Sequence, residues 1–265
     1  MKFVLICIAL LAASMAQAEE RILALSPHAC EVLFAIGAGE EIVGAADYCD
    51  YPDEAKALPR VGSFNRTYAE AALRLNPSMA VVFDSQLPGV ARLESLGVEI
   101  VKSHPLSVEE MLGDISRLGR ITGHELQARQ LVGALRTRLQ ALQGRQAEPV
   151  RVFYEAWSEP LISSGRTSFI NDVLRLSGAT NIFGELAIES PRVSVEAVIK
   201  ASPDVILVPD ESAHIESREA FWQRYLGKRV TVLAVPQDML SRPGPRVISA
   251  IESLSVRLSM VRRNG

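Results

Sequence analysis

Short apolar runs alternate with amphipathic segments along most of the chain. Each run is apolar at consecutive positions, the pattern of a strand buried on both faces of a sheet. Segments with helical spacing, for example Ala29–Ile36, Ala69–Leu75 and Phe169–Ser177, lie between the runs. This alternation predicts an α/β fold with mostly parallel sheets covered by helices. The predicted strands are Arg21–Leu25, Ile42–Ala46, Met79–Phe83, Val98–Val101, Val150–Ala156, Asp204–Val208 and Val230–Val235.

The middle of the chain, from Val108 to about Arg145, has a helical pattern and no predicted strand. Gly123 divides this region, and His124–Leu142 then carries leucines at amphipathic spacing. A long helix between two α/β segments predicts a rigid strut that joins two lobes, although a surface helix of one larger domain has the same pattern. We expect an N-terminal lobe at residues 19–122, a linking helix at 123–146 and a C-terminal lobe at 147–265.

Two segments in the two halves match each other in register. Glu70–Phe83 and Glu196–Pro209 each begin with glutamate, continue as a helix, and reach a proline (Pro77 or Pro203) before an apolar strand. Units of α/β proteins often resemble one another. However, these copies occupy equivalent places in the two halves, which favours duplicated lobes with pseudo-two-fold symmetry.

The N-terminus has the pattern of a secretory signal peptide at residues 1–18. Lys2 precedes an apolar run, Phe3–Ala13, and Ala16–Ala18 supplies small residues for cleavage after Ala18. The run is shorter than the roughly 20 residues of a membrane span. An uncleaved anchor, a buried helix or a lipoprotein is the alternative, but Cys7 lies in the middle of the run. We therefore expect an exported protein.

Net charge and motifs narrow the function. The formal net charge is −3, and cleavage would remove Lys2, so a nucleic-acid partner is not expected. The sequence contains no G-x-S-x-G, H-E-x-x-H or P-loop motif. Gly37-Ala-Gly39 resembles a dinucleotide fingerprint, but Ile42 stands at the third glycine position and the segment is best explained as a helix end. We expect a binding protein and not an enzyme, with no cofactor.

Cys30 and Cys49 each follow a predicted strand, so both lie at the same edge of the sheet. In an oxidising compartment this pair predicts a disulfide. Two free thiols or a metal pair are the alternatives.

Candidate binding residues gather after the strands, where α/β folds bind ligands. His28 follows the first strand, as a ligand contact, an axial metal ligand or a solvated helix-start residue. Aromatic rings at strand ends would line a cleft for a large, partly apolar ligand, or cap the core. Arginines on the C-terminal loops would hold anionic or amide groups, or be solvated. These residues are Tyr48, Tyr51, Phe64, Phe83, Tyr154 and Trp157, with Arg192, Arg242 and Arg246.

Several motifs along the chain resemble those of the periplasmic cobalamin-binding proteins, within the class that binds siderophores, haem and corrinoids. The resemblance covers nearly the whole chain after residue 18. It is carried by Leu25-Ser-Pro-His-Ala-Cys-Glu31, Asp50-Tyr-Pro52, Val61-Gly62, Leu75-Asn-Pro77, Leu96-Gly97, Ser164-Gly165, Gly178-Ala-Thr-Asn-Ile-Phe183, Val193-Ser-x-Glu196, Ser202-Pro-Asp204 and Arg242-Pro-Gly-Pro-Arg246.

The resemblance implies two lobes with a ligand between them and a helical hinge that allows little closure. It also implies that Glu70 and Glu196 dock the monomeric protein onto a dimeric ABC transporter permease. Tyr48 matches a family tyrosine, whereas two family tryptophans appear here as phenylalanines, and His28 replaces a small or amide residue. The predicted ligand-binding residues are His28, Tyr48, Phe64, Phe83, Trp157, Arg192, Asp238 and Arg246.

The leading hypothesis is capture of a cobalt corrinoid, cobalamin or cobinamide. A ferric siderophore, haem or another metal chelate is the alternative within the same class. Two other readings are less favoured. A metal-ion binder using His28, Cys30 and Cys49 requires free thiols, and a periplasmic hydrolase has no recognisable nucleophile and base.

Overall fold

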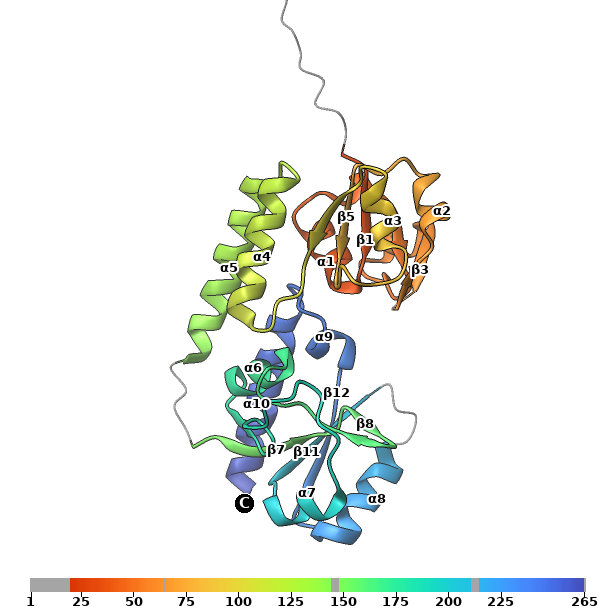
Figure 1. The fold of residues 1–265 in the computed structure, drawn as a ribbon. Coiled ribbons are helices and arrows are strands. Elements are labelled where there is room, and N and C mark those ends of the chain that lie inside the picture. The colour runs from red at the N-terminus through yellow and green to blue at the C-terminus, as the bar shows by residue number, and fades with distance from the viewer. Residues whose placement is uncertain (1–19, 64, 144–147, 211–214, 265) are drawn as a thin grey trace, which may run out of the picture.

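The computed structural model describes residues 20–63, 65–143, 148–210 and 215–264. The chain forms two α/β lobes, one above the other in Figure 1, with helices α4 and α5 along one side. This confirms the predicted fold class. The predicted signal peptide lies outside the described residues.

The N-terminal lobe contains a six-stranded sheet in the order β4-β3-β2-β1-β5-β6. All its strand pairs are parallel except β3 and β4, which form an antiparallel pair. Along β1, alternate residues face opposite sides, so Ile22 and Ala24 pack under α1 and α4 whereas Leu23 and Leu25 pack under α2 and α3. The elements are β1 (Ile22–Leu25), α1 (Pro27–Ala35), β2 (Ile42–Ala46), β3 (Arg60–Ser63), β4 (Arg66–Thr67), α2 (Ala69–Leu73), β5 (Met79–Val82), α3 (Val90–Ser95) and β6 (Glu99–Lys102), with short 3₁₀ turns at Gly39–Glu41 and Asp53–Ala57.

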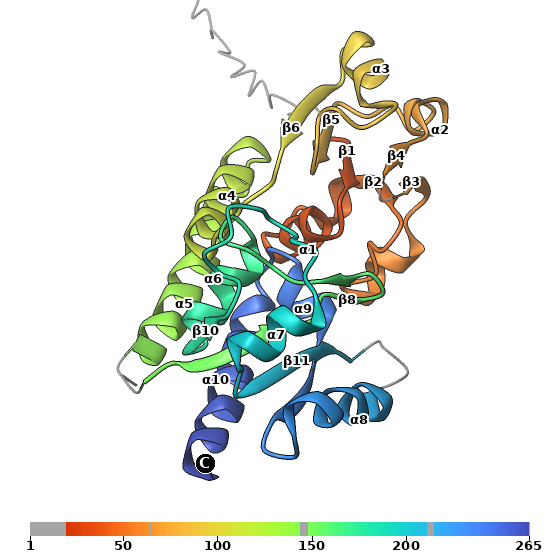
Figure 2. The same ribbon diagram turned by 60° about the horizontal axis from the view of Figure 1, so that its bottom comes forward.

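The C-terminal lobe contains a parallel four-stranded sheet in the order β10-β7-β11-β12 and a small β8–β9 hairpin. Helices α6 and α10 cover one face of this sheet, and α7 and α8 cover the other (Figure 2). The elements are β7 (Val150–Tyr154), β8 (Trp157–Ser158), β9 (Leu161–Ile162), α6 (Phe169–Leu176), β10 (Ala179–Asn181), α7 (Val195–Ala201), β11 (Val205–Pro209), α8 (Ile215–Leu226), β12 (Thr231–Val235), α9 (Gln237–Ser241) and α10 (Val247–Asn264).

The sequence repeat corresponds to a structural repeat. Its copies form α2–β5 and α7–β11, and the three-strand order β1-β5-β6 of one lobe matches β7-β11-β12 of the other. The residues before the two prolines, Asn76 and Ser202, both take the left-handed conformation, with φ of 47° and 48°. A left-handed residue commonly ends a helix. Ser202 is the C-cap of α7, whereas α2 ends at Leu73 and Asn76 lies shortly after it, so the two lobes share a left-handed residue before the proline.

Helices α4 (Val108–Ile121) and α5 (Glu125–Gln143) form an antiparallel pair connected by a turn at Gly123, which has a positive φ of 75°. The helices approach closely at Gly119, where an added Cβ would lie 2.3 Å from the Cβ of Ala128. Helix α5 runs from beside the N-terminal lobe to beside the C-terminal lobe (Figure 1). The strut predicted from the leucine spacing is thus the second helix of a hairpin.

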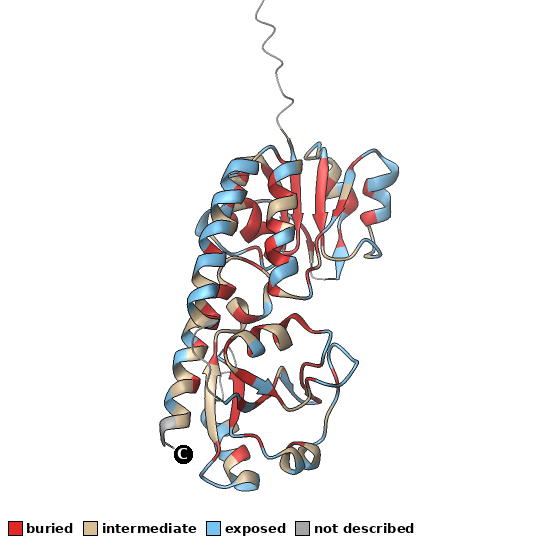
Figure 3. Cartoon of the chain, turned by 90° about the vertical axis from the view of Figure 1, so that its left-hand side faces the viewer, coloured by how far each residue is buried: buried red, intermediate tan, exposed pale blue. Residues whose placement is uncertain are grey.

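One apolar cluster crosses both lobes. It includes residues of β1 and β2, of the α4–α5 hairpin, and of β7, β11, α6 and α10. Buried positions accordingly continue from the upper sheet through the helices to the lower sheet (Figure 3). Among the helices in the described part of the chain, none combines the length and apolar character that a membrane span requires.

The predicted disulfide between Cys30 and Cys49 is wrong for this structure, in which both cysteines are buried free thiols. The thiol of Cys49 points to the carbonyl oxygens of Ala24 and Ser26, at 3.6 and 3.7 Å. A hydrogen bond with Cys30, together with burial, raises the pKa of Cys49. Both thiols lie near each other because they follow neighbouring strands at the same edge of the sheet. They are neighbours but not a covalent pair.

Candidate functional site

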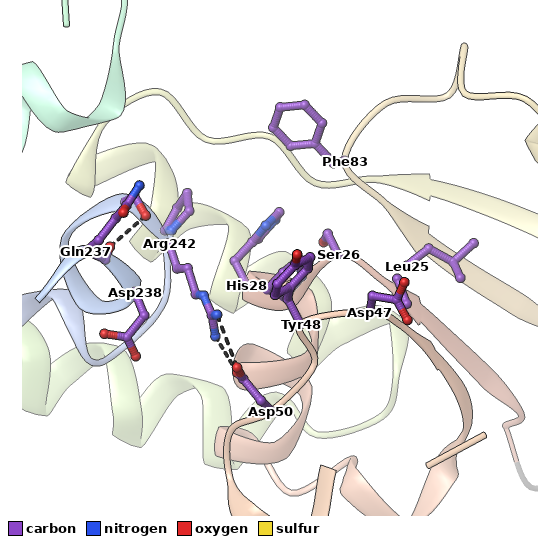
Figure 4. A pocket seen from close by; sticks show the side chains of 14 residues that line it. Leu25, Ser26, His28, Asp47, Tyr48, Asp50, Phe83, Gln237, Asp238 and Arg242 are labelled. Atoms are coloured by element: carbon purple, nitrogen blue, oxygen red, sulfur yellow. Dashed lines mark hydrogen bonds and ion pairs between the residues drawn. The ribbon is translucent and has the colours of Figure 1, made fainter. Parts of the chain in front are cut away.

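A pocket of about 520 Å³ lies between the lobes. Both lobes contribute to it through the segments that follow their strands (Figure 4). The lining residues are Leu25, Ser26, Pro27, His28, Ala46, Asp47, Tyr48, Asp50, Phe83, Gln237, Asp238, Ser241, Arg242 and Pro243.

The topology explains why these residues meet. The parallel strands β1, β2 and β5 end at one edge of the N-terminal sheet, immediately before His28, Tyr48 and Phe83. Strand β12 ends at Val235 and leads into α9, which brings Asp238 to the opposite wall. Carboxyl ends of parallel strands are the usual ligand-binding edge of α/β sheets. Here two such edges face each other across one pocket.

Tyr48 presents its ring to solvent at the pocket rim, and 66% of the residue is exposed. Its φ is 65°, a left-handed conformation that is uncommon for a bulky residue. Phe83 lies on another wall, next to His104 with 4.0 Å between ring centroids. An exposed aromatic ring held in an unfavourable backbone conformation indicates a binding surface.

A cluster of charged side chains connects the lobes beside the pocket. Glu31, buried on α1, accepts hydrogen bonds from Arg246, at 2.5 Å to Nη2 and 3.0 Å to Nε, and lies 3.4 Å from Arg242 Nη1. Arg242 also binds Asp50 at 2.6 Å, and this hydrogen bond lowers the pKa of Asp50. Arg246 binds Asp238 at 2.8 Å.

Hydrogen bonding to Glu31 also raises the pKa of Arg246, and the guanidinium lies 4.0 Å from the ring centroid of Tyr51. Both arginines that follow α9 are therefore held by carboxylates of the N-terminal lobe.

His28 is fixed by a chain of hydrogen bonds behind the pocket wall. Its Nε2 lies 2.8 Å from Ser103 Oγ, which donates to Asp114 Oδ2 at 2.5 Å. Arg117 Nε binds the other carboxylate oxygen of Asp114 at 3.0 Å. Burial lowers the pKa of His28 to about 4. The imidazole is therefore neutral at neutral pH.

This low pKa predicts an acid-sensitive contribution to stability. In the unfolded chain the imidazole takes up a proton near pH 6.5, whereas in the folded chain it does so only near pH 4. Between these values the unfolded state binds more protons, so the free energy of unfolding falls as the pH falls, by roughly 3 kcal/mol. The loss is complete below the folded-state pKa.

Urea unfolding at pH 7 and at about pH 4.5 measures this effect. The His28→Gln variant should lose less stability between the two pH values than the wild-type protein does. Equal losses in the two proteins would show that His28 is not the group responsible.

The other predicted ligand residues are distributed differently. Trp157 and Arg192 do not line the pocket. They flank Ile162 of β9, which pairs with Trp157 in the β8–β9 hairpin and with Arg192 through an isolated bridge on its other side. Trp157 is 61% exposed and lies just beyond β7, at the ligand-facing edge of the C-terminal sheet. Arg246 belongs to the charged cluster that connects the lobes. Phe64 lies outside the described residues.

Sequence reasoning missed several polar residues of the pocket wall. All lie shortly after the end of a predicted strand. That position was the sequence feature that could have identified them as pocket residues. They are Ser26, Asp47, Asp50, Gln237 and Ser241.

The described residues contain no group of three or more His, Cys, Asp or Glu side chains that could hold a metal ion. His28 binds Ser103, and Cys49 faces backbone carbonyls. The set His28, Cys30 and Cys49 is thus not assembled as a metal site in this structure.

Two lobes with facing sheet edges and a solvent-open pocket define a protein that holds a ligand between α/β lobes. The family model for periplasmic binding proteins matches residues 22–252, and the chain belongs to this family.

A vitamin B12-binding protein of Yersinia pestis (strain Pestoides F) is 31% identical over 250 residues, which cover 93% of this chain and 89% of the relative. The crystal structure of the periplasmic vitamin B12-binding protein BtuF of Vibrio cholerae aligns with a TM-score of 0.83 and 30% identity, over 92% of this chain and 98% of that one. The periplasmic haem-binding protein RhuT of Roseiflexus sp. RS-1 aligns with a TM-score of 0.81 and 25% identity, over 91% and 98%.

Proposed function

We propose that this protein captures a corrinoid, cobalamin or cobinamide, in the pocket between its lobes and delivers it to the permease of an ABC transporter. The observation that carries the proposal is the pocket itself, in which the ligand-binding edges of two sheets face each other and an exposed aromatic ring stands at the rim. The relatives named for vitamin B12 binding support the corrinoid as ligand. The protein works by capture and release, without chemistry on the ligand.

Calorimetric titration of the purified protein with cyanocobalamin and with cobinamide tests the proposal. We expect saturation near one ligand per chain with a Kd below about 1 μM, because binding proteins of this design bury a large apolar ligand face. Binding of haem or a ferric siderophore, with no binding of either corrinoid, would instead establish the alternative ligand class, which the haem-binding relatives make a specific competitor.

The remaining parts of the proposal concern export and delivery. Residues 1–18 are proposed to be a signal peptide cleaved after Ala18, with lobes at 19–122 and 147–265 and a linking helix at 123–146. Glu70 and Glu196 are proposed to dock a monomer of this protein onto the permease dimer. Both side chains are exposed in the first turns of the equivalent helices α2 and α7. Two equivalent acids on duplicated lobes suit a two-fold symmetric partner with basic residues.

A further inference from the structure

The pocket contains one buried hydroxyl that the protein does not use. Ser26 is only 3% exposed, lines the pocket, and its Oγ has no hydrogen-bond partner in the described part of the chain. Ser26 stands at the N-cap of α1, where a serine hydroxyl ordinarily accepts a backbone N–H, but it makes no such bond. A buried hydroxyl without a partner costs stability. Its position is explained if a ligand supplies the partner.

His28 presents a hydrogen-bond acceptor two residues further on. The Ser103 hydroxyl has one proton, and Asp114, held by Arg117, takes it, so Ser103 accepts the proton of His28 Nε2. This assigns the tautomer and leaves the lone pair on Nδ1. No hydrogen bond to Nδ1 is found among the described residues. Because His28 lines the pocket, Nδ1 is the ring atom left for a ligand there.

The pocket lining is acidic. Asp47, Asp50 and Asp238 line it, whereas Arg242 is the sole cationic side chain among its described lining residues. Arg242 is already bound to Asp50 and lies near Glu31, and Arg246 behind it is bound to Glu31 and Asp238. Both guanidinium groups are thus already paired with carboxylates, which weakens their attraction for an anionic ligand. Asp47 forms no ion pair with any residue that the structure describes, so its charge faces the pocket uncompensated.

We propose that Ser26 and His28 form a carboxamide-binding subsite, and that the acidic lining around them selects ligands with an amide edge over ligands with a carboxylate edge. A primary carboxamide donates N–H to His28 Nδ1 and accepts the Ser26 proton at its carbonyl oxygen. A carboxylate has no proton to donate to His28 Nδ1, and the negative charge of Asp47 repels it. Corrinoids carry carboxamides around the ring, whereas haem carries carboxylates. The inference rests on the proposed function and extends it to the choice between these two ligands.

The test uses two ligands that differ only at the corrin edge. These are dicyanocobinamide and dicyanocobyrinic acid, in which the same ring and cobalt carry carboxylates in place of amides. In titrations at neutral pH the amide form should bind about 100-fold more tightly or better, because like charges across an interface cost several kcal/mol. The Asp47→Asn variant should reduce the ratio between the affinities for the amide form and the carboxylate form. Equal affinities for the two ligands in the wild-type protein would overturn the subsite while leaving corrinoid capture intact.

A pair of serine variants tests the hydroxyl directly. Ser26→Ala should weaken dicyanocobinamide binding roughly fivefold to tenfold while the thermal midpoint of the free protein stays the same or rises, since an unpartnered buried group is removed. Ser241→Ala is the matched control, because Ser241 also lines the pocket but its hydroxyl already donates to the Gln237 carbonyl at 2.6 Å. Unchanged affinity in Ser26→Ala would contradict the assignment. Failure of every corrinoid to bind would overturn both the proposed function and the subsite.

Discussion

Replacing Glu70 and Glu196 together by arginine is expected to abolish ligand uptake while ligand capture remains unchanged. Both glutamates are exposed at the starts of equivalent helices, and neither lines the pocket. Under the proposed docking, charge reversal would turn an attraction to basic permease residues into repulsion at two symmetric points. Such like-charge contacts cost several kcal/mol, which corresponds to a loss of about 100-fold or more in transport.

Uptake of radiolabelled cyanocobalamin by cells that depend on this protein measures the loss, and calorimetry on the purified variant measures capture. The double variant Glu94→Arg/Glu216→Arg is the matched control, since these glutamates are also exposed, one on a helix of each lobe. Wild-type uptake in the Glu70/Glu196 variant would exclude docking through these residues. Loss of uptake in both double variants would mean that charge alone, and not position, is responsible.

Glu31→Gln is expected to destabilise the folded protein by about 3 kcal/mol or more. The carboxylate is 2% exposed, and two guanidinium groups from the C-terminal lobe converge on it. Removing one member of a buried ion cluster leaves the remaining charges uncompensated, which typically costs 3–5 kcal/mol. For a chain of this size the loss corresponds to a fall of roughly 10 °C in Tm.

Thermal unfolding followed by circular dichroism measures this change. Glu109→Gln serves as the control, because Glu109 also binds an arginine, Arg136, but the pair lies at the surface with 70% of the Glu109 side chain exposed. The surface variant should change stability by less than about 1 kcal/mol. Equal effects of the two substitutions would show that the cluster between the lobes is no more important than a surface pair.

Most strands that the sequence predicted are apolar runs, and β1, β5 and β11 among them are buried on both faces. Runs such as Ile42–Ala46 were recognisable because every position is apolar, and the structure places that strand at the same residues. The missed strands β3, β4, β8, β9 and β10 are short, and most carry polar residues, as in Arg60-Val-Gly-Ser and Ala-Thr-Asn181. Their pairing depends on the neighbouring strand, which local composition does not encode.

The pocket was predictable in position but not in its charge arrangement. The strand ends indicated His28, Tyr48 and Phe83, the family resemblance indicated Asp238, and all four residues line the same pocket. By contrast, the pairing of Glu31 with Arg246 joins residues more than two hundred positions apart, and no local pattern reveals it. The same limit applies to the cysteines, because a shared sheet edge brings thiols near each other without setting the geometry that a disulfide needs.

The apolar cluster that crosses both lobes has a consequence for how the chain is completed during synthesis. Helix α10 supplies Val247, Ile251 and Leu258 to this cluster and packs on α5 and α6, although it is the last helix to emerge. The N-terminal lobe shares the same cluster through α4 and α5, whereas its second cluster, on the side of α2 and α3, contains no residue of α10. We therefore expect one face of the N-terminal sheet to complete its core early in synthesis and the other face to complete it only when α10 is in place.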